Sequence, residues 1–181
     1  MKPLVKRFLV ASLVLASIGA ASAGLLSVVN LFTAGPIAAN EEKAVQRALS
    51  DVFSEEGVAF EETEGFEKKA YQGTYFTIDL ENLWSASKGG SEIGVVYQAY
   101  GKNSYGDVRA LIGIVDGAIS RISFVSNSES YGQTLEDEYL AKVNKDGFDV
   151  ADIKCGATYG AKLVQDMGNG ALADYKERRA N

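Results

Sequence analysis

The chain has 181 residues, and its 18 Lys and Arg against 24 Asp and Glu give a formal charge of −6 at pH 7. It has no histidine and one cysteine, which excludes catalytic His pairs, His-bound haem, His-based metal sites, internal disulfides and clusters held by several cysteines. We therefore expect no metal site. An acidic chain without a basic cluster is also not expected to bind nucleic acid.

The N-terminal region has the pattern of a membrane anchor. No charged side chain occurs between Phe8 and Asn40, and the apolar stretch from Phe8 to Phe32 would span about 37 Å as a helix, against roughly 30 Å of hydrocarbon. Cations precede this stretch at Lys2, Lys6 and Arg7. By the positive-inside rule, we expect residues 1–35 to cross the inner or plasma membrane once, with the N-terminus cytoplasmic and the C-terminal domain extracytoplasmic.

Two features of this segment leave alternatives open. Ala21-Ser22-Ala23 resembles a signal-peptide cleavage site, but the apolar run continues to Phe32, which favours a retained anchor. Small residues also recur at every fourth position. This stripe is either a face for packing against another transmembrane helix or a result of the high Ala, Ser and Gly content. Its members are Ser12, Ala16, Ala20 and Gly24.

The rest of the chain predicts a linker with an amphipathic helix over residues 36–57 and one domain over 58–181. Asn40 is a good helix cap, and helical spacing of apolar residues continues to about Phe53. Strands are expected next, with a polar segment around Gly89-Gly90 and a hairpin turn at Asp116-Gly117. The expected strands are 58–62, 71–79, 93–100, 108–115 and 118–125.

Helices are expected after the strands. A loop over 126–134 leads to a short helix over 135–143, and a longer helix runs from Thr158 toward Lys176, with a possible break at Gly168-Asn169-Gly170. The sequence therefore predicts an α+β domain in which an antiparallel sheet is flanked by helices.

The segment before the last helix reads Asp152-Ile153-Lys154-Cys155-Gly156-Ala157-Thr158. Small residues here leave backbone N–H groups accessible, and a helix N-terminus favours a phosphate. Thr158 presents a hydroxyl at that position. On this reasoning alone the segment is either a phosphate site or an ordinary capped helix start.

This segment resembles the flavinylation motif Asp-x-x-(Ser/Thr)-Gly-Ala-Thr of the FMN-binding domain shared by RnfG and NqrC. Asp152, Gly156, Ala157 and Thr158 match the motif, whereas Cys155 stands where the family usually has Ser or Thr. The resemblance implies that Thr158 carries FMN through a phosphoester bond, which a flavin transferase installs from FAD.

The resemblance extends along most of the chain. The length of the chain favours RnfG over NqrC, which is usually longer. Tyr105-Gly106-Asp107-Val108 is similar to the start of a strand pair in the family, and the loop over 127–134 occupies the place of a His-x-Glu-Thr-Pro-Gly-Leu-Gly segment. Glu129 and Gly132 match that loop, but its His and Pro are missing. The resemblance implies a covalent FMN site with no catalytic residue, and Lys162 is added for its charge one helical turn after Thr158. The predicted cofactor-binding residues are Thr158, Gly156, Ala157, Cys155, Asp152, Glu129, Ser130, Gly132 and Lys162.

Several of these residues have a second interpretation. Cys155 is either a small, partly buried residue or a redox thiol, and Asp152 either serves the transferase or caps local backbone. Lys162 either offsets the phosphodiester charge or is simply solvated. Tyr131, Tyr159 and Trp84 are either ring-stacking residues or ordinary core and surface aromatics.

The resemblance implies an electron-transfer subunit that has no complete catalytic activity alone. It would act in a membrane complex that couples ferredoxin:NAD⁺ electron transfer to Na⁺ or H⁺ translocation, with the other membrane and peripheral subunits and the flavin transferase as partners. Two alternatives remain. The chain is either a free-standing extracytoplasmic flavoprotein or, if Thr158 is only a cap, a non-redox anchored binding module.

Overall fold

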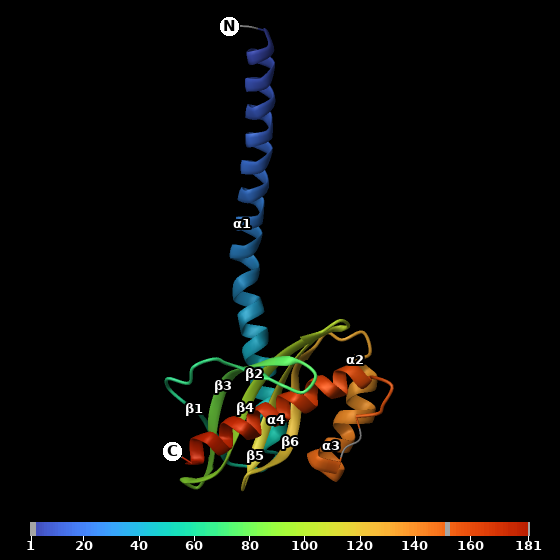
Figure 1. The fold of residues 1–181 in the computed structure, drawn as a ribbon. Coiled ribbons are helices and arrows are strands. Elements are labelled where there is room, and N and C mark those ends of the chain that lie inside the picture. The colour runs from blue at the N-terminus through green and yellow to red at the C-terminus, as the bar shows by residue number, and fades with distance from the viewer. Residues whose placement is uncertain (1–2, 151–152, 181) are drawn as a thin grey trace. The chain divides into compact units, whose positions relative to one another are not determined.

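The computed structural model describes residues 3–150 and 153–180, and the side chains of residues 3–7, 9, 10, 26, 28, 29, 31–34 and 150 lie outside that description. The chain forms two compact units, one up to Lys43 and one from Ala44 onward (Figure 1). Among the described residues, no helix is both long enough and apolar enough to cross a membrane. The expected span from Phe8 to Phe32 falls partly on side chains outside the described set.

Helix α1 (Pro3–Val52) contributes residues to both units. The expectation of a capped helix start at Asn40 is wrong, because α1 runs through Pro36 and Asn40 without a break. Alanine and glutamate follow Pro36 closely, and their high helix propensity maintains the helix despite the backbone hydrogen bond that proline cannot make. The helical character expected up to about Phe53 is confirmed as far as Val52.

The second unit is built on a six-stranded antiparallel sheet in the described part of the chain. The strand order is β1-β3-β4-β5-β6. β1 and β2 pair with the same edge of β3, β2 near the start of that strand and β1 near its end. The predicted α+β class with an antiparallel sheet is therefore confirmed. The strands are β1 (Val58–Glu62), β2 (Lys69–Gln72), β3 (Thr77–Lys88), β4 (Ser91–Asn103), β5 (Gly106–Val115) and β6 (Ala118–Asn127).

The first part of the sheet differs from the sequence expectation. The strand expected over 71–79 is instead two strands, because the chain turns at Gly73, whose N–H donates to the Phe76 carbonyl (2.9 Å). No strand was expected between residues 79 and 93, but β3 continues there to Lys88. A register shift between Leu80 and Asn82 moves the buried positions out of simple alternation, which hides the strand pattern in the sequence.

The predicted hairpin at Asp116-Gly117 is confirmed. Both residues have positive φ, 51° and 81°, as expected for the two central residues of a type I′ turn between antiparallel strands. Gly89-Gly90 adopts the same left-handed region, with φ of 60° and 83°, and joins β3 to β4. The glycine pair therefore marks a second tight hairpin.

Helices cover both faces of the sheet. On one face, buried residues of α4 (Thr158–Ala180) pack against side chains of β3 to β6, together with a helical segment of α2 (Gly132–Thr134), η1 (Leu135–Leu140) and α3 (Ala141–Asp146), followed by η2 (Phe148–Val150). On the other face, the end of α1 buries Leu49 and Val52 against Trp84, Val96 and Leu111. Alternating side chains of β5 therefore serve two separate cores.

The predicted helices over 135–143 and from Thr158 onward are confirmed, but the glycines in α4 do not break it. A Cβ at Gly168 would lie 2.3 Å from Phe148 Cζ, and one at Gly170 would lie 2.9 Å from Ile78 Cδ1. These glycines admit neighbouring side chains, so close packing compensates for their low helix propensity.

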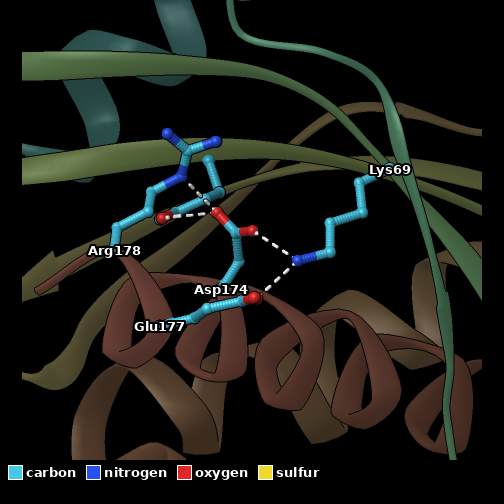
Figure 2. A network of polar contacts seen from close by, with 5 residues as sticks. Lys69, Asp174, Glu177 and Arg178 are labelled. Carbon is cyan, nitrogen blue, oxygen red and sulfur yellow. Dashed lines mark hydrogen bonds and ion pairs between the residues drawn. The ribbon is translucent and has the colours of Figure 1, made fainter. Parts of the chain in front are cut away.

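A polar network attaches the C-terminal end of α4 to the sheet (Figure 2). Asp174, which is 5% exposed, accepts hydrogen bonds from Lys69 Nζ (3.1 Å), Arg178 Nε (2.6 Å) and Tyr97 Oη (3.1 Å). Lys69 also pairs with Glu177 (2.6 Å). The network links α4 to β2 through Lys69 and to β4 through Tyr97, so a buried carboxylate is fully compensated.

We expect Asp174→Asn to lower the free energy of unfolding at pH 7 by about 1–3 kcal/mol. Burial alone would raise the pKa of Asp174, but hydrogen bonds from Arg178 and Lys69 outweigh it and hold the pKa below the ordinary value of 3.8. A carboxyl with a lowered pKa stabilises the folded state above its unfolded-state pKa, and this contribution is lost as pH falls through the folded-state pKa.

The penalty should therefore be complete at neutral pH and shrink as pH falls below about 4. Urea titrations followed by the fluorescence of Trp84, the one tryptophan in the chain, measure it. Glu177→Gln is the matched control, since Glu177 is 62% exposed and its loss should cost little. A penalty for Asp174→Asn that does not change with pH would contradict this assignment.

Candidate functional site

Thr158 is the first residue of α4, and its hydroxyl does not cap the helix. The Ala157 carbonyl accepts the first helical hydrogen bond, from Ala161 N–H (2.9 Å), and Thr158 Oγ1 donates to the Cys155 carbonyl (2.7 Å). A capping side chain would instead accept a hydrogen bond from a first-turn N–H. The hydroxyl therefore points back to the loop before α4, and the first-turn N–H groups have no acceptor within the helix.

The loop before α4 is held against the preceding helical segment. Gly156 N–H donates to Glu138 Oε2 (2.8 Å), and a Cβ at Gly156 would lie 2.8 Å from Thr134 Cγ2. Cys155 is half-buried and packs against the main core. Asp152, one of the predicted site residues, lies outside the described residues.

Hydrogen bonds join the predicted loop residues to the end of β4 and to the turn between β4 and β5. Asn103 donates through Nδ2 to the Glu129 carboxylate and accepts through Oδ1 from Tyr105 N–H (2.7 Å). Ser130 N–H donates to the Tyr105 carbonyl (2.9 Å), and Gly132 N–H donates to the Glu129 carbonyl (3.0 Å). This loop therefore has a fixed position beside α4.

These elements enclose a cavity of about 260 Å³ in front of Thr158. Of the predicted site residues, the structure brings Thr158, Gly156, Ala157 and Glu129 together on its wall. Ser130 and Gly132 support the loop without lining the cavity, and Lys162 is not among the lining residues either. The lining residues are Tyr105, Glu129, Tyr131, Gly156, Ala157, Thr158, Tyr159 and Gly160.

Tyrosines form the rim of this cavity. The ring centroids of Tyr105 and Tyr159 are 5.5 Å apart, and those of Tyr105 and Tyr131 are 5.9 Å apart. Tyr131 and Tyr159 were expected as possible stacking residues. Tyr105 was missed, because the sequence pattern indicated only that it precedes a strand. Trp84 is not part of the site, because it packs under the end of α1 on the opposite face of the sheet.

Glu129 contributes a buried carboxyl group to the cavity wall. It is 8% exposed, and its carboxylate accepts a hydrogen bond from Asn103. Burial raises the pKa of Glu129, and the Asn103 hydrogen bond opposes that rise only in part. A Cβ at Gly160 would lie 2.7 Å from Glu129 Oε2, so a glycine at this position is what allows the carboxyl to approach the first turn of α4.

The donor set fits a ligand with a phosphate at one end and a flat apolar body. First-turn N–H groups and the Thr158 hydroxyl suit the phosphate, and exposed tyrosine rings suit an aromatic group. Lys162 supplies a positive charge nearby, with Nζ 5.6 Å from the centroid of the Tyr159 ring. A negatively charged ligand favours the protonated form of Glu129, which its raised pKa makes easier to reach.

The fold and the site define an α+β domain whose final helix begins with a threonine that lines a cavity together with three tyrosines. Comparison with protein families adds an independent finding: residues 1–52 match the family model described as the RnfG N-terminal region. This match confirms the resemblance to RnfG and supports an RnfG-type subunit. The matched residues precede the sheet and the site. A comparison with curated proteins finds no match.

We expect Glu129→Gln to stabilise the protein at pH 7. A carboxyl whose pKa is raised on folding weakens the folded state as pH rises above its ordinary pKa of 4.5. Glutamine keeps an oxygen that can accept the Asn103 hydrogen bond but carries no charge to desolvate.

The same urea titration followed by Trp84 fluorescence tests this expectation. The gain in unfolding free energy should vanish well below pH 4.5, where both side chains are neutral. Glu62→Gln, at an exposed position of β1, serves as the control and should show no comparable gain. A loss of stability for Glu129→Gln at pH 7 would show that the carboxylate is favourably bound.

Proposed function

We propose that this chain is the electron-transfer subunit of an Rnf-type complex and carries FMN as a phosphoester on Thr158. One observation carries the proposal: the Thr158 hydroxyl, within the Gly156-Ala157-Thr158 motif, lies on the wall of a tyrosine-rimmed cavity at a helix start. The match to the RnfG N-terminal region supports the same assignment from a separate part of the chain.

Attachment requires one bond to form and one to break. Thr158 Oγ1 bonds to the phosphorus on the FMN side of FAD, the anhydride bond breaks, AMP leaves, and the hydroxyl proton passes to solvent or to a base of the flavin transferase. The Cys155 carbonyl, which accepts the hydrogen bond from the hydroxyl, orients this oxygen. First-turn N–H groups of α4 stabilise the resulting phosphodiester charge.

Bound FMN would supply one- and two-electron redox chemistry, and the protein would supply position and electrostatics. Glu129 and Ser130 keep the loop over 127–132 fixed beside the site through Asn103 and Tyr105. Thr134 fills the space that a side chain at Gly156 would need, so a glycine is required beside Thr158. The cavity is thereby shaped by residues that do not take part in bond formation.

We further propose that the N-terminal segment anchors the protein in the inner or plasma membrane, with the flavin domain outside the cytoplasm. The family match supports membrane association. Apolar side chains with described positions in the first unit are strongly exposed, including Leu13 (72%), Leu15 (74%) and Leu25 (69%). Such a surface is stable in hydrocarbon or against other apolar helices, so the remaining subunits of the complex are the expected partners.

We expect Thr158→Val to abolish covalent flavin while the fold survives, because valine keeps the shape of threonine but has no hydroxyl. Intact-protein mass spectrometry of the chain, co-produced with its flavin transferase, measures the attached mass. Thr134→Val, next to Gly156 but outside the motif, is the matched control and should retain the flavin. Full FMN mass on the Thr158→Val variant would rule out this attachment site.

We expect the flavin domain to react with an impermeant thiol reagent added to intact cells. Ser91 begins β4 in an exposed position, so Ser91→Cys provides the label. The parent should carry Cys155→Ser, which removes the native thiol and restores the residue type usual at that motif position. Labelling of Ser91→Cys only after lysis would show that the domain is cytoplasmic.

A further inference from the structure

The turn between β2 and β3 is held onto α4 by one buried side chain. Asp166 is fully buried, and its carboxylate accepts three backbone hydrogen bonds, from Thr74 N–H (2.8 Å), Tyr75 N–H (2.8 Å) and Phe76 N–H (2.7 Å). A Cβ at Gly73 would lie 2.4 Å from Asp166 Cγ. The turn therefore has a fixed position relative to the helix that begins with Thr158.

This turn presents an aromatic ring to the cation on the same helix. Lys162 Nζ lies 4.7 Å from the centroid of the Tyr75 ring and 5.6 Å from that of Tyr159. Cation–π contacts of this kind favour a position of the ammonium group between the two rings. Lys162 is four residues from both Thr158 and Asp166. The Thr158 hydroxyl, the Lys162 ammonium group and the Asp166 carboxylate therefore follow one another on the same face of α4.

The exposed aromatic surface of the second unit is concentrated here. Among its described residues, the large apolar or aromatic side chains that are exposed are four tyrosines, and all four lie in this region. Exposed aromatic side chains gathered in one region are typical of a binding surface. The four are Tyr75 (44%), Tyr105 (41%), Tyr131 (54%) and Tyr159 (52%).

Within this patch, Tyr75 stands apart from the cluster that the other three rings form. Tyr105 contacts both Tyr131 and Tyr159, so those three rings already pack against one another. Among the described ring contacts, Tyr75 meets only the Lys162 ammonium. Lys162 is about 6 Å beyond Thr158 along the helix axis, a rise that the ribityl chain of FMN can cross.

We propose that Tyr75 and Lys162 form the subsite for the isoalloxazine ring, and that Asp166 is a positioning residue that holds Tyr75 there. This inference rests on the proposed function, because it assigns the ring end of a ligand attached at Thr158. The Tyr75 ring covers one face of the isoalloxazine, and the Lys162 ammonium lies near its polar edge. A nearby cation favours the more negatively charged reduced form and raises the midpoint potential.

The test uses the full-length protein, co-produced with its flavin transferase and purified in detergent. Tyr75→Leu should retain covalent FMN by intact mass, and its flavin emission should rise severalfold, because a stacked tyrosine quenches an excited flavin by electron transfer. Tyr175→Leu is the control, since Tyr175 lies near the C-terminal end of α4, far from Lys162. The centroid of its ring is 5.4 Å from Arg179 Cζ. Its emission should equal that of the wild type.

The charge is tested separately by redox titration. Lys162→Gln should shift the midpoint potential of the attached flavin to a more negative value. Lys176→Gln makes the same charge change about 21 Å further along the helix axis, more than a Debye length away at physiological salt, and should leave the potential unchanged. Asp166→Asn places an amide NH₂ against backbone N–H donors and should reproduce the emission change of Tyr75→Leu.

The outcomes separate this inference from the proposed function. Absence of covalent FMN from the wild-type protein would overturn both. Retained FMN with unchanged emission in Tyr75→Leu and unchanged potential in Lys162→Gln would overturn the ring subsite alone. Loss of co-purifying subunits in Tyr75→Leu without any change in emission would assign the patch to a protein partner instead. Should Asp166→Asn fail to fold, the other two variants decide the matter.

Discussion

The packing of one ridge of α4 against an edge of the sheet determines where the site lies. Residues spaced four apart form a ridge along a helix. The ridge that starts at Thr158 runs antiparallel to β2, so its later residues contact β2 and its earlier residues contact the turn after β2. Asp174 binds Lys69, Gly170 admits Tyr71, Asp166 binds the turn, and Lys162 contacts Tyr75. The ridge consists of Thr158, Lys162, Asp166, Gly170, Asp174 and Arg178.

This arrangement explains why a strand as short as β2 keeps its place at the edge of the sheet. Four residues paired with β3 on one side give few hydrogen bonds, and an isolated short strand is only marginally stable. Contacts with the α4 ridge supply the remaining constraint, through ion pairs at one end and three backbone hydrogen bonds at the other. The turn that carries Tyr75 is therefore fixed against α4.

Among the described residues of the second unit, three buried carboxylates differ in how fully hydrogen bonds and ion pairs compensate them. Asp166 has three backbone donors, and Asp174 has two cations and a tyrosine hydroxyl. Glu129 is bound by the neutral amide of Asn103, and burial raises its pKa. The two aspartates hold elements together, whereas Glu129 lies in the cavity wall beside Thr158. The buried carboxyl group with the weakest hydrogen bonding thus lies at the site where a charged ligand would bind.

The sequence predicted the local parts of this structure well. Asp116-Gly117 specifies its own turn, and the Gly156-Ala157-Thr158 motif lies within one short segment, so neither depends on distant residues. β3 was missed because a register shift disrupts its alternation. Tyr75 and Asp166 were missed because they meet only after folding, from positions 91 residues apart. An acidic residue inside a helix gives no local sign that it binds a remote turn.

The exposure of the site also accounts for the covalent bond in the proposed function. Pockets that retain a ligand by noncovalent contacts bury most of its surface, whereas the tyrosines around Thr158 remain about half exposed. A ring on such a surface would be held weakly by stacking alone, yet its open edge could approach a redox partner. An ester at Thr158 removes the need for deep burial, because retention then depends on one bond. The protein can therefore keep the flavin both permanent and accessible, and a rigid turn and a single cation suffice to orient it.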